Sequence, residues 1–252
     1  MVLTDRKAFR TSMGFSSEEK TKRYLKFTDE IPVDWNRLES CNTRVKDIFA
    51  KINKVIHSEI RIDLFEFNNK IDYAYTEMRK NKLFQKLTNN GRNPVDVYYN
   101  WLRGYAVCEF FIKSISLIFD IPIENIKRIG KGDFTNIKVF KRKSDADFEI
   151  VINETLKYKL EVQSGFTGVN DIKKTKIDIA EKVKNSENIE SYLIHFDLFN
   201  GQVALCCTSN IDTKDITWIT KFENSKTMPI SSDSFKWNLE DKPKKYAELS
   251  YN

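Results

Sequence analysis

The most regular alternation of apolar and polar positions in the chain predicts a β-hairpin between residues 146 and 163. Residues 146–152 and 157–163 both alternate with period two, and the polar turn between them centres on Glu154. This pattern is typical of two half-buried antiparallel strands. The apolar positions are Ala146, Phe148, Ile150 and Ile152 on the first strand, and Tyr158, Leu160 and Val162 on the second.

The register of this hairpin sets Asp147 opposite Glu161. A slip by one residue would mix the apolar and polar faces and is disfavoured, whereas a slip by two keeps the faces and makes the carboxylates diagonal neighbours. Like charges directly opposite on a sheet, with side chains roughly 5 Å apart, are destabilising, and a bound cation is the simplest reason to tolerate them. The predicted pairs are Phe148 with Leu160, Glu149 with Lys159, and Ile150 with Tyr158.

Helical spacing of apolar residues precedes the hairpin. It predicts helices from Trp35 to about His57 and from Arg61 to Met78. A third, mostly buried helix begins with Asn93 as N-cap and Pro94 at the first helical position, and runs to about Asp120.

Strand-like segments occur at 126–129 and 136–140, and two further strands, 190–199 and 202–208, flank the turn Asn200-Gly201. Between the hairpin and these strands we expect a helix capped by Asn170. The order predicts an α/β (α+β) fold, a mixed β-sheet flanked by helices with a helical N-terminal extension. We divide it into a polar N-terminal arm (1–34), a helical region (35–92), a core (93–210) and a C-terminal extension of coil or short strands (211–252), which form one compact unit.

Composition narrows the class of protein. Among 252 residues, 42 Lys and Arg exceed 36 Asp and Glu, a net charge of +6 that is compatible with a polyanionic partner. The four cysteines lack zinc-ligand spacing, and we expect them to be reduced. The longest apolar run, Tyr105 to Phe119, is interrupted by Glu109 and Lys113 and is too short for a membrane span, and the first residues lack the apolar h-region of a signal peptide. We therefore expect an intracellular, cytoplasmic protein with no membrane partner.

An Asp followed by a hairpin and then Glu-x-Gln resembles the PD-(D/E)xK nuclease superfamily, particularly the type II restriction endonucleases. The matching residues are Ala146-Asp147 and Glu161-Val162-Gln163. Ala146 stands where the family has Pro, and Gln163 where it usually has Lys, although some restriction enzymes use Gln. The resemblance covers residues 94–210, and it implies a restriction-endonuclease-like fold for the core.

The resemblance implies Mg²⁺ as cofactor, held by Asp147, Glu161 and the carbonyl of Val162. It also implies that Gln163 orients the water or stabilises the transition state. Because a neutral amide supplies no charge, Lys159 or one of the lysines Lys173, Lys174 and Lys176 would help. Glu109 on the buried helix is an additional candidate ligand, and Asp145 is a reserve if the register slips.

Each of these residues has a plainer interpretation. An Asp or Glu on a strand is most often a solvated edge residue, a helical Glu109 pairs with a nearby Lys or Arg, and the lysines after Gly168 form a solvated face. His195, on an apolar strand, is a satisfied core histidine. With only His57 and His195 in the chain and no glycine-rich phosphate loop, paired-His nucleases and nucleotide-binding enzymes lack their parts.

The segment from residue 79 to 92 is basic and contains no acidic residue. We expect it to contact DNA through phosphates and base edges, with a solvated helix end as the alternative. The DNA-binding candidates are Arg79, Lys80, Lys82, Lys86, Asn90 and Arg92, together with Lys173 and Lys174.

These observations favour a type II restriction endonuclease that cleaves double-stranded DNA as a prokaryotic homodimer, without a nucleotide cofactor. Two hypotheses stay open beside it: a structure-specific repair or recombination nuclease, and a non-catalytic nucleic-acid-binding or protein-interaction domain.

Overall fold

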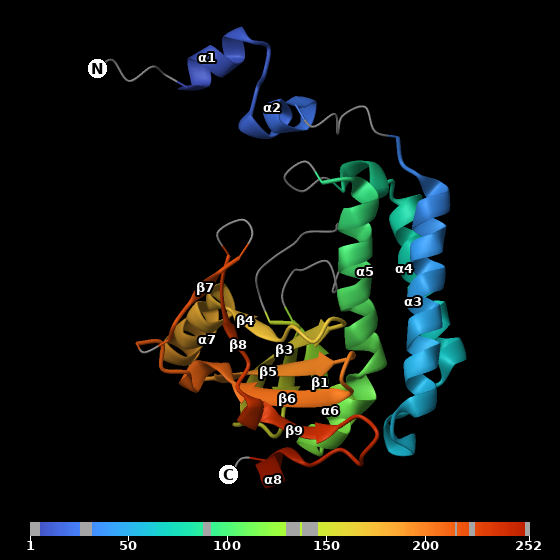
Figure 1. Ribbon diagram of the computed structural model, residues 1–252, viewed down its shortest axis with the longest axis vertical. Helices are drawn as coiled ribbons and strands as arrows, with labels where there is room; N and C mark the ends of the chain where they lie inside the picture. Colours follow the sequence, from blue (N-terminus) through green and yellow to red (C-terminus); the bar gives the residue numbers. More distant parts are fainter. Residues whose placement is uncertain are drawn as a thin grey trace.

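The computed structural model is a mixed sheet with helices on both faces (Figure 1). It describes residues 6–25, 32–87, 92–129, 137, 146–214, 216–221 and 225–249. The helical layer formed by α3, α4 and α5 stands on one side of the sheet, and α7 covers the other. The fold class predicted from the sequence is confirmed at this level.

The three long helices begin at side-chain caps. Helix α3 (Trp35–Val55) starts after Asp34, α4 (Leu64–Lys80) after Asp63, and α5 (Pro94–Phe110) after Asn93, with Pro94 in its first turn. Each cap side chain accepts a hydrogen bond from a backbone N–H of the first turn, which the helix itself leaves without a partner. The predicted helices are therefore confirmed, with ends shifted by a few residues.

The predicted helix from 93 to 120 is wrong in one respect, because it breaks at Phe111 into α5 and α6 (Ile112–Phe119). Phe111 is fully buried, and its ring stacks on Phe196 of the sheet with centroids 3.8 Å apart. Residue Asp120, in the left-handed region with φ 53°, ends α6 before Pro122. The apolar pattern continues through Phe111, so the sequence carries no sign of the break.

The main sheet has the order β1-β2-β3-β5-β6-β9. Its neighbours are antiparallel except β3 and β5, which run parallel because the chain crosses over through α7 (Lys174–Glu187) between them. The strands are β1 (Ile126–Arg128), β2 (Phe148–Val151), β3 (Lys157–Gly165), β5 (Glu190–Asp197), β6 (Gln202–Cys207) and β9 (Phe235–Asn238). The predicted strand at 136–140 lies outside the described residues, apart from Ile137 in a turn.

Two hydrophobic cores lie on opposite faces of this sheet. Phe148, Leu160 and Ile194 belong to the large core shared with the long helices, whereas Leu193 and Ile177 belong to a smaller core under α7. Alternate residues of β3 therefore face different layers. Lys159, Glu161 and Gln163 lie on the face opposite to Leu160, the face that α7 covers.

A second, three-stranded sheet has the order β4-β8-β7. Strand β4 (Asp171–Lys173) directly precedes α7 and pairs with β8 (Lys226–Pro229), which pairs with β7 (Ile219–Thr220). The predicted helix cap at Asn170 is therefore wrong: the chain forms a strand there, paired with a segment more than fifty residues later.

The short elements complete the chain. Helices α1 (Arg6–Ser12) and α2 (Glu18–Leu25) lie within the predicted arm, beyond the end of α3 in Figure 1, and no described residue of α2 is buried. Helix α8 (Tyr246–Leu249) lies near the C-terminus. None of the helices in the described ranges is long and apolar enough to cross a membrane. Single 3-10 turns lie at Ser58–Ile60, Phe84–Lys86, Ile123–Asn125, Thr208–Asn210 and Ser232–Ser234.

Candidate functional site

The hairpin of β2 and β3 has the predicted register. Phe148 pairs with Leu160, and Ile150 pairs with Tyr158. The ladder ends at Phe148, and the backbone N–H of Asp147 still donates to the carbonyl oxygen of Leu160 over 3.1 Å. Continued by one residue beyond Phe148, the same register brings Asp147 to the position opposite Glu161.

The side chain of Asp147 is tied to the strand that carries Glu161. Its Oδ2 accepts a hydrogen bond from the backbone N–H of Val162 at 2.8 Å. The N–H and C=O of one residue in an extended strand point to the same side, so the Val162 carbonyl faces the Asp147 side of β3. The Asp147 carboxylate thus lies against the backbone of Val162, near enough to Glu161 for that charge to act on it.

Burial perturbs both carboxyl groups, and the charge of Glu161 adds to the effect on Asp147. Loss of solvent, followed by the neighbouring Glu161 carboxylate, raises the pKa of Asp147 to about 7. Burial also raises the pKa of Glu161, and the ammonium of Lys176 opposes that rise. Two neighbouring carboxyl groups whose charged forms are disfavoured by burial are typical of a functional site.

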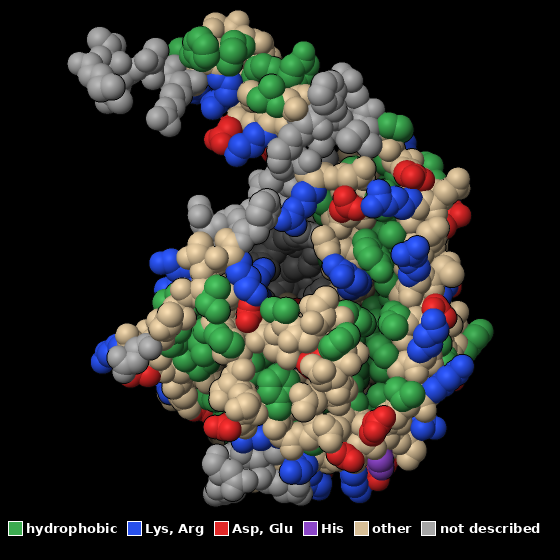
Figure 2. Space-filling view, in the orientation of Figure 1, with side chains coloured by type: hydrophobic (Ala, Val, Ile, Leu, Met, Phe, Trp, Pro, Cys, Tyr) green, Lys and Arg blue, Asp and Glu red, His purple; other side chains and the backbone are tan. Residues whose placement is uncertain are grey.

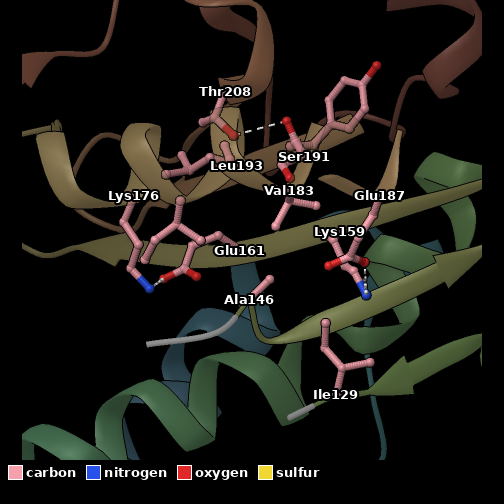
Figure 3. A pocket seen from close by; sticks show the side chains of 13 residues that line it. Ile129, Ala146, Lys159, Glu161, Lys176, Val183, Glu187, Ser191, Leu193 and Thr208 are labelled. Atoms are coloured by element: carbon pink, nitrogen blue, oxygen red, sulfur yellow. Dashed lines mark hydrogen bonds and ion pairs between the residues drawn. The ribbon is translucent and has the colours of Figure 1, made fainter. Parts of the chain in front are cut away.

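The ammonium group of Lys176, from the first turns of α7, contacts Glu161 directly and acts on Asp147 as a nearby charge. Its Nζ lies 2.6 Å from Oε1 of Glu161. Figure 3 marks this ion pair with a dashed line. Both residues line a cavity of about 240 Å³ between α7 and the sheet. Of the lysines considered as helpers, Lys176 forms an ion pair with Glu161, and Lys173 lowers the pKa of Glu161 as a nearby charge.

Lys159 lies at the other end of that cavity and is engaged elsewhere. Its Nζ is 3.0 Å from Glu149. It is also 3.9 Å from Glu187, which lines the cavity beside it (Figure 3). The structure therefore gives Lys159 carboxylate partners of its own, distinct from Asp147 and Glu161.

Gln163 shares the face of Glu161, as the alternation of β3 requires. Its Nε2 donates to the carbonyl oxygen of Asp171 on β4 over 2.8 Å. Because an amide carries both donor and acceptor, this bond fixes the orientation of the side chain while Oε1 stays an acceptor.

Glu109 is taken up by two ion pairs. Its carboxylate is 9% exposed, contacts the guanidinium of Arg128, and lies 2.8 Å from the ammonium of Lys70. The plainer interpretation of Glu109, a helical Glu paired with basic neighbours, is the one that the structure bears out. The reserve candidate Asp145 lies outside the described residues.

The predicted DNA-binding segment is anchored between helices. Arg79 stacks on the ring of Trp35, 4.8 Å from its centroid, and lies 3.7 Å from Glu39, so part of its charge is committed to α3. The side chains of Lys80, Lys82, Lys86 and Arg92 are exposed, whereas Asn90 lies outside the described residues. Lys173, at the end of β4, is exposed. Lys174, at the start of α7, pairs with Asp178 at 2.6 Å.

A buried polar network lies beside Gln163 and was not predicted from the sequence. Asn170 donates through Nδ2 to Asp197 at 2.7 Å, and its Oδ1 lies 2.7 Å from Nε2 of His195. His195 and Asp197 are fully buried. His195 is a core histidine as predicted, but only half satisfied, because Nδ1 has no partner. The network fixes the chain between β3 and β4.

The donor set suits a hard cation. Mg²⁺ prefers oxygen ligands and is commonly held by one or two carboxylates, with water and substrate phosphate completing its shell. Within the described ranges there is no group of three or more His, Cys, Asp or Glu side chains placed to hold a metal. A zinc-type cage is not formed there, whereas two carboxylates and a carbonyl fit the less complete protein shell of Mg²⁺.

Comparisons with known proteins give no further guide, since no protein-family model, curated protein or solved structure matches the chain.

Proposed function

We propose that this protein is a Mg²⁺-dependent endonuclease of the PD-(D/E)xK superfamily that hydrolyses phosphodiester bonds in double-stranded DNA. The observation that carries the proposal is the pair Asp147 and Glu161, held side by side in a half-buried site with raised pKa values. Two neighbouring carboxyl groups whose charged forms are disfavoured in the free protein are suited to binding a cation, which would compensate their charge.

The order of elements is compatible with this proposal. A helix, an antiparallel β1-β2-β3 unit, a crossover helix and a parallel strand β5 follow one another. Glu161 lies on β3, and Asp147 lies directly before β2. We infer a restriction-endonuclease-like core, and a type II restriction enzyme acting as a cytoplasmic homodimer in a prokaryotic cell.

In this reaction each residue has a defined task. Asp147, Glu161 and the Val162 carbonyl would hold the magnesium ion, which polarises the phosphoryl oxygen and lowers the pKa of water when bound. The Asp147 carboxylate is kept in place by the Val162 N–H. Gln163 is oriented by its bond to Asp171. Its Oε1 accepts a hydrogen bond from the attacking water and so aligns that water.

The surface charge is suited to a polyanion. Figure 2 shows Lys and Arg side chains around a hollow beside α5 and above the sheet. The net charge of +6 adds a weaker, non-specific attraction to phosphate.

The test is digestion of plasmid DNA with and without Mg²⁺, with Asp147→Ala as the control. Discrete bands that need both Mg²⁺ and Asp147 support a sequence-specific endonuclease. A smear that needs both would indicate a structure-specific or non-specific nuclease. Cleavage by neither protein would leave a non-catalytic binding domain and overturn the proposal.

A further inference from the structure

Lys176 holds a position that the metal would need. Its Nζ lies 2.6 Å from Glu161, and among the described residues no other ion pair reaches Asp147 or Glu161. Both partners are shielded, with 29% of the Lys176 side chain and 20% of the Glu161 side chain exposed. The contact is therefore a half-buried ion pair within the metal-ligand set itself.

Packing at the start of α7 directs Lys176 to this position. Its neighbour Ile177 is buried against Ile172 of β4 and Leu193 of β5 in the smaller core. Because β4 is also paired with β8, the first turn of α7 is held over the sheet from two sides. Lys176 is thus placed by the scaffold, and its contact with Glu161 is more than a chance meeting of surface side chains.

The same ammonium moderates both carboxyl groups. Lys176 is a charge that lowers the pKa of Asp147 and of Glu161 against the effect of their burial. Its removal would leave two neighbouring carboxylates with less compensation. A divalent cation at the same oxygens would supply this compensation instead, and would repel the ammonium.

Resting on the nuclease function proposed above, we propose that Lys176 is an exchangeable counter-ion of the metal site. It neutralises Glu161 in the metal-free protein, leaves it when a divalent cation binds, and then contacts a phosphate oxygen of the DNA. A Lys side chain suits this exchange, because it is a compact charge on a flexible four-carbon stem. Gln163, being neutral, leaves the positive charge at this site to Lys176.

The same helix offers a matched control in Lys174. It pairs with Asp178 at 2.6 Å and lies over the ring of Trp218, so its replacement removes an equal charge close by without touching Glu161. Methionine keeps most of the length of either lysine and removes its charge, and Lys176→Arg keeps the charge.

The experiment measures binding of Mn²⁺, as a spectroscopic stand-in for Mg²⁺, by electron paramagnetic resonance without DNA at one ionic strength. We expect Lys176→Met to bind Mn²⁺ at least tenfold more tightly than the wild type, and Lys174→Met to stay within twofold. Mn²⁺ should also raise the melting temperature of Lys176→Met more than that of the wild type. At saturating metal, Lys176→Met should cleave DNA at least tenfold more slowly, and Lys176→Arg should recover part of that loss.

The outcomes separate this inference from the proposed function. Unchanged or weaker Mn²⁺ binding by Lys176→Met, with Glu161→Gln abolishing it, would overturn the counter-ion role and leave the metal site standing. If Lys176→Met binds Mn²⁺ more tightly but cleaves at the wild-type rate, the phosphate contact is wrong. If Glu161→Gln binds Mn²⁺ as the wild type does, the metal site and the counter-ion role both fail.

Discussion

The backbone N–H of Val162 donates to the carboxylate of Asp147 over 2.8 Å, which links one acidic residue of the site to the neighbour of the other. Glu161 and Val162 are consecutive, so a shift of either strand would move both carboxylates relative to this bond. The position of the Asp147 carboxylate relative to β3 is therefore fixed by the backbone of that strand.

Replacement of either carboxylate should abolish cleavage and leave the fold intact. We expect Asp147→Ala and Glu161→Ala each to lose at least about 100-fold in rate, the loss typical of one group that stabilises a transition state. Because each change also relieves a repulsion, DNA binding should be unchanged or tighter. Plasmid cleavage and filter binding measure the two effects.

Glu149→Ala is the matched control, since Glu149 lies on the same hairpin and pairs with Lys159 instead. Its cleavage rate should stay within a few fold of the wild type. Near-normal turnover in the Asp147 or Glu161 variant would show that the metal site is assigned wrongly.

Gln163→Ala should be slowed about 100-fold, because a misplaced reacting group costs about that much. Gln163→Lys should retain part of the activity, since a lysine there would supply charge and a donor. Single-turnover cleavage at saturating Mg²⁺ separates this loss from weaker binding. Equal rates for Gln163→Ala and the wild type would exclude a role for the amide.

The metal-free protein should become less stable as the pH rises from about 4 to about 8. The pKa of Asp147 is raised by burial from 3.8 to about 7, so its contribution to stability is complete below 3.8 and is lost as the pH rises through 7. Thermal melts of Asp147→Asn should show a weaker dependence over this range. A wild type with the same dependence as Asp147→Asn would contradict the raised pKa.

The same pKa predicts an effect on activity. Because the proton and Mg²⁺ compete for Asp147, the acid limb of the cleavage profile should lie near pH 7 and move to lower pH as Mg²⁺ is raised. If the acid limb does not move with the Mg²⁺ concentration, it reports the titration of another group.

The exposed lysines Lys80, Lys82 and Lys86 should contribute to DNA affinity through phosphates. Replacing all three should reduce the slope of log K against log salt by about three units at most. The slope is measured by fluorescence anisotropy on one duplex. An unchanged slope would move the DNA surface elsewhere, with Lys173 and Lys174 as the next candidates.

Asn170→Ala should destabilise the protein by about 2 kcal/mol, because it removes a donor from the buried Asp197. Asn210→Ala, at an exposed position, should change the free energy of unfolding by less than about 0.5 kcal/mol. Urea unfolding compares the two, and equal effects would show that the network around Asn170 adds no stability.

The hairpin could be predicted from the sequence because the pairing of Phe148 with Leu160 is short-range and both strands alternate strictly. The contact of Lys176 with Glu161 could not be predicted from the sequence. Three lysines lie within four residues, and only the crossover from β3 to α7 decides which of them reaches Glu161.

The two errors in the fold also come from long-range contacts. The chain breaks at Phe111 because that ring stacks on Phe196, and it forms a strand after Asn170 because β4 pairs with β8. Local patterns contain neither partner. In both places the tertiary contact overrides a helical signal that is sound by itself.

The placement of Lys176 on a crossover helix has a consequence for the order of folding. The β2-β3 hairpin closes over a short turn, so Asp147 and Glu161 meet early, whereas α7 docks only when β5 pairs with β3. A folding intermediate with the hairpin alone thus carries the repulsion of two carboxylates without their counter-ion. At neutral pH, Glu161→Gln should therefore refold faster than the wild type. The repulsion between the Asp147 and Glu161 carboxylates would thus slow the assembly of the sheet that carries them.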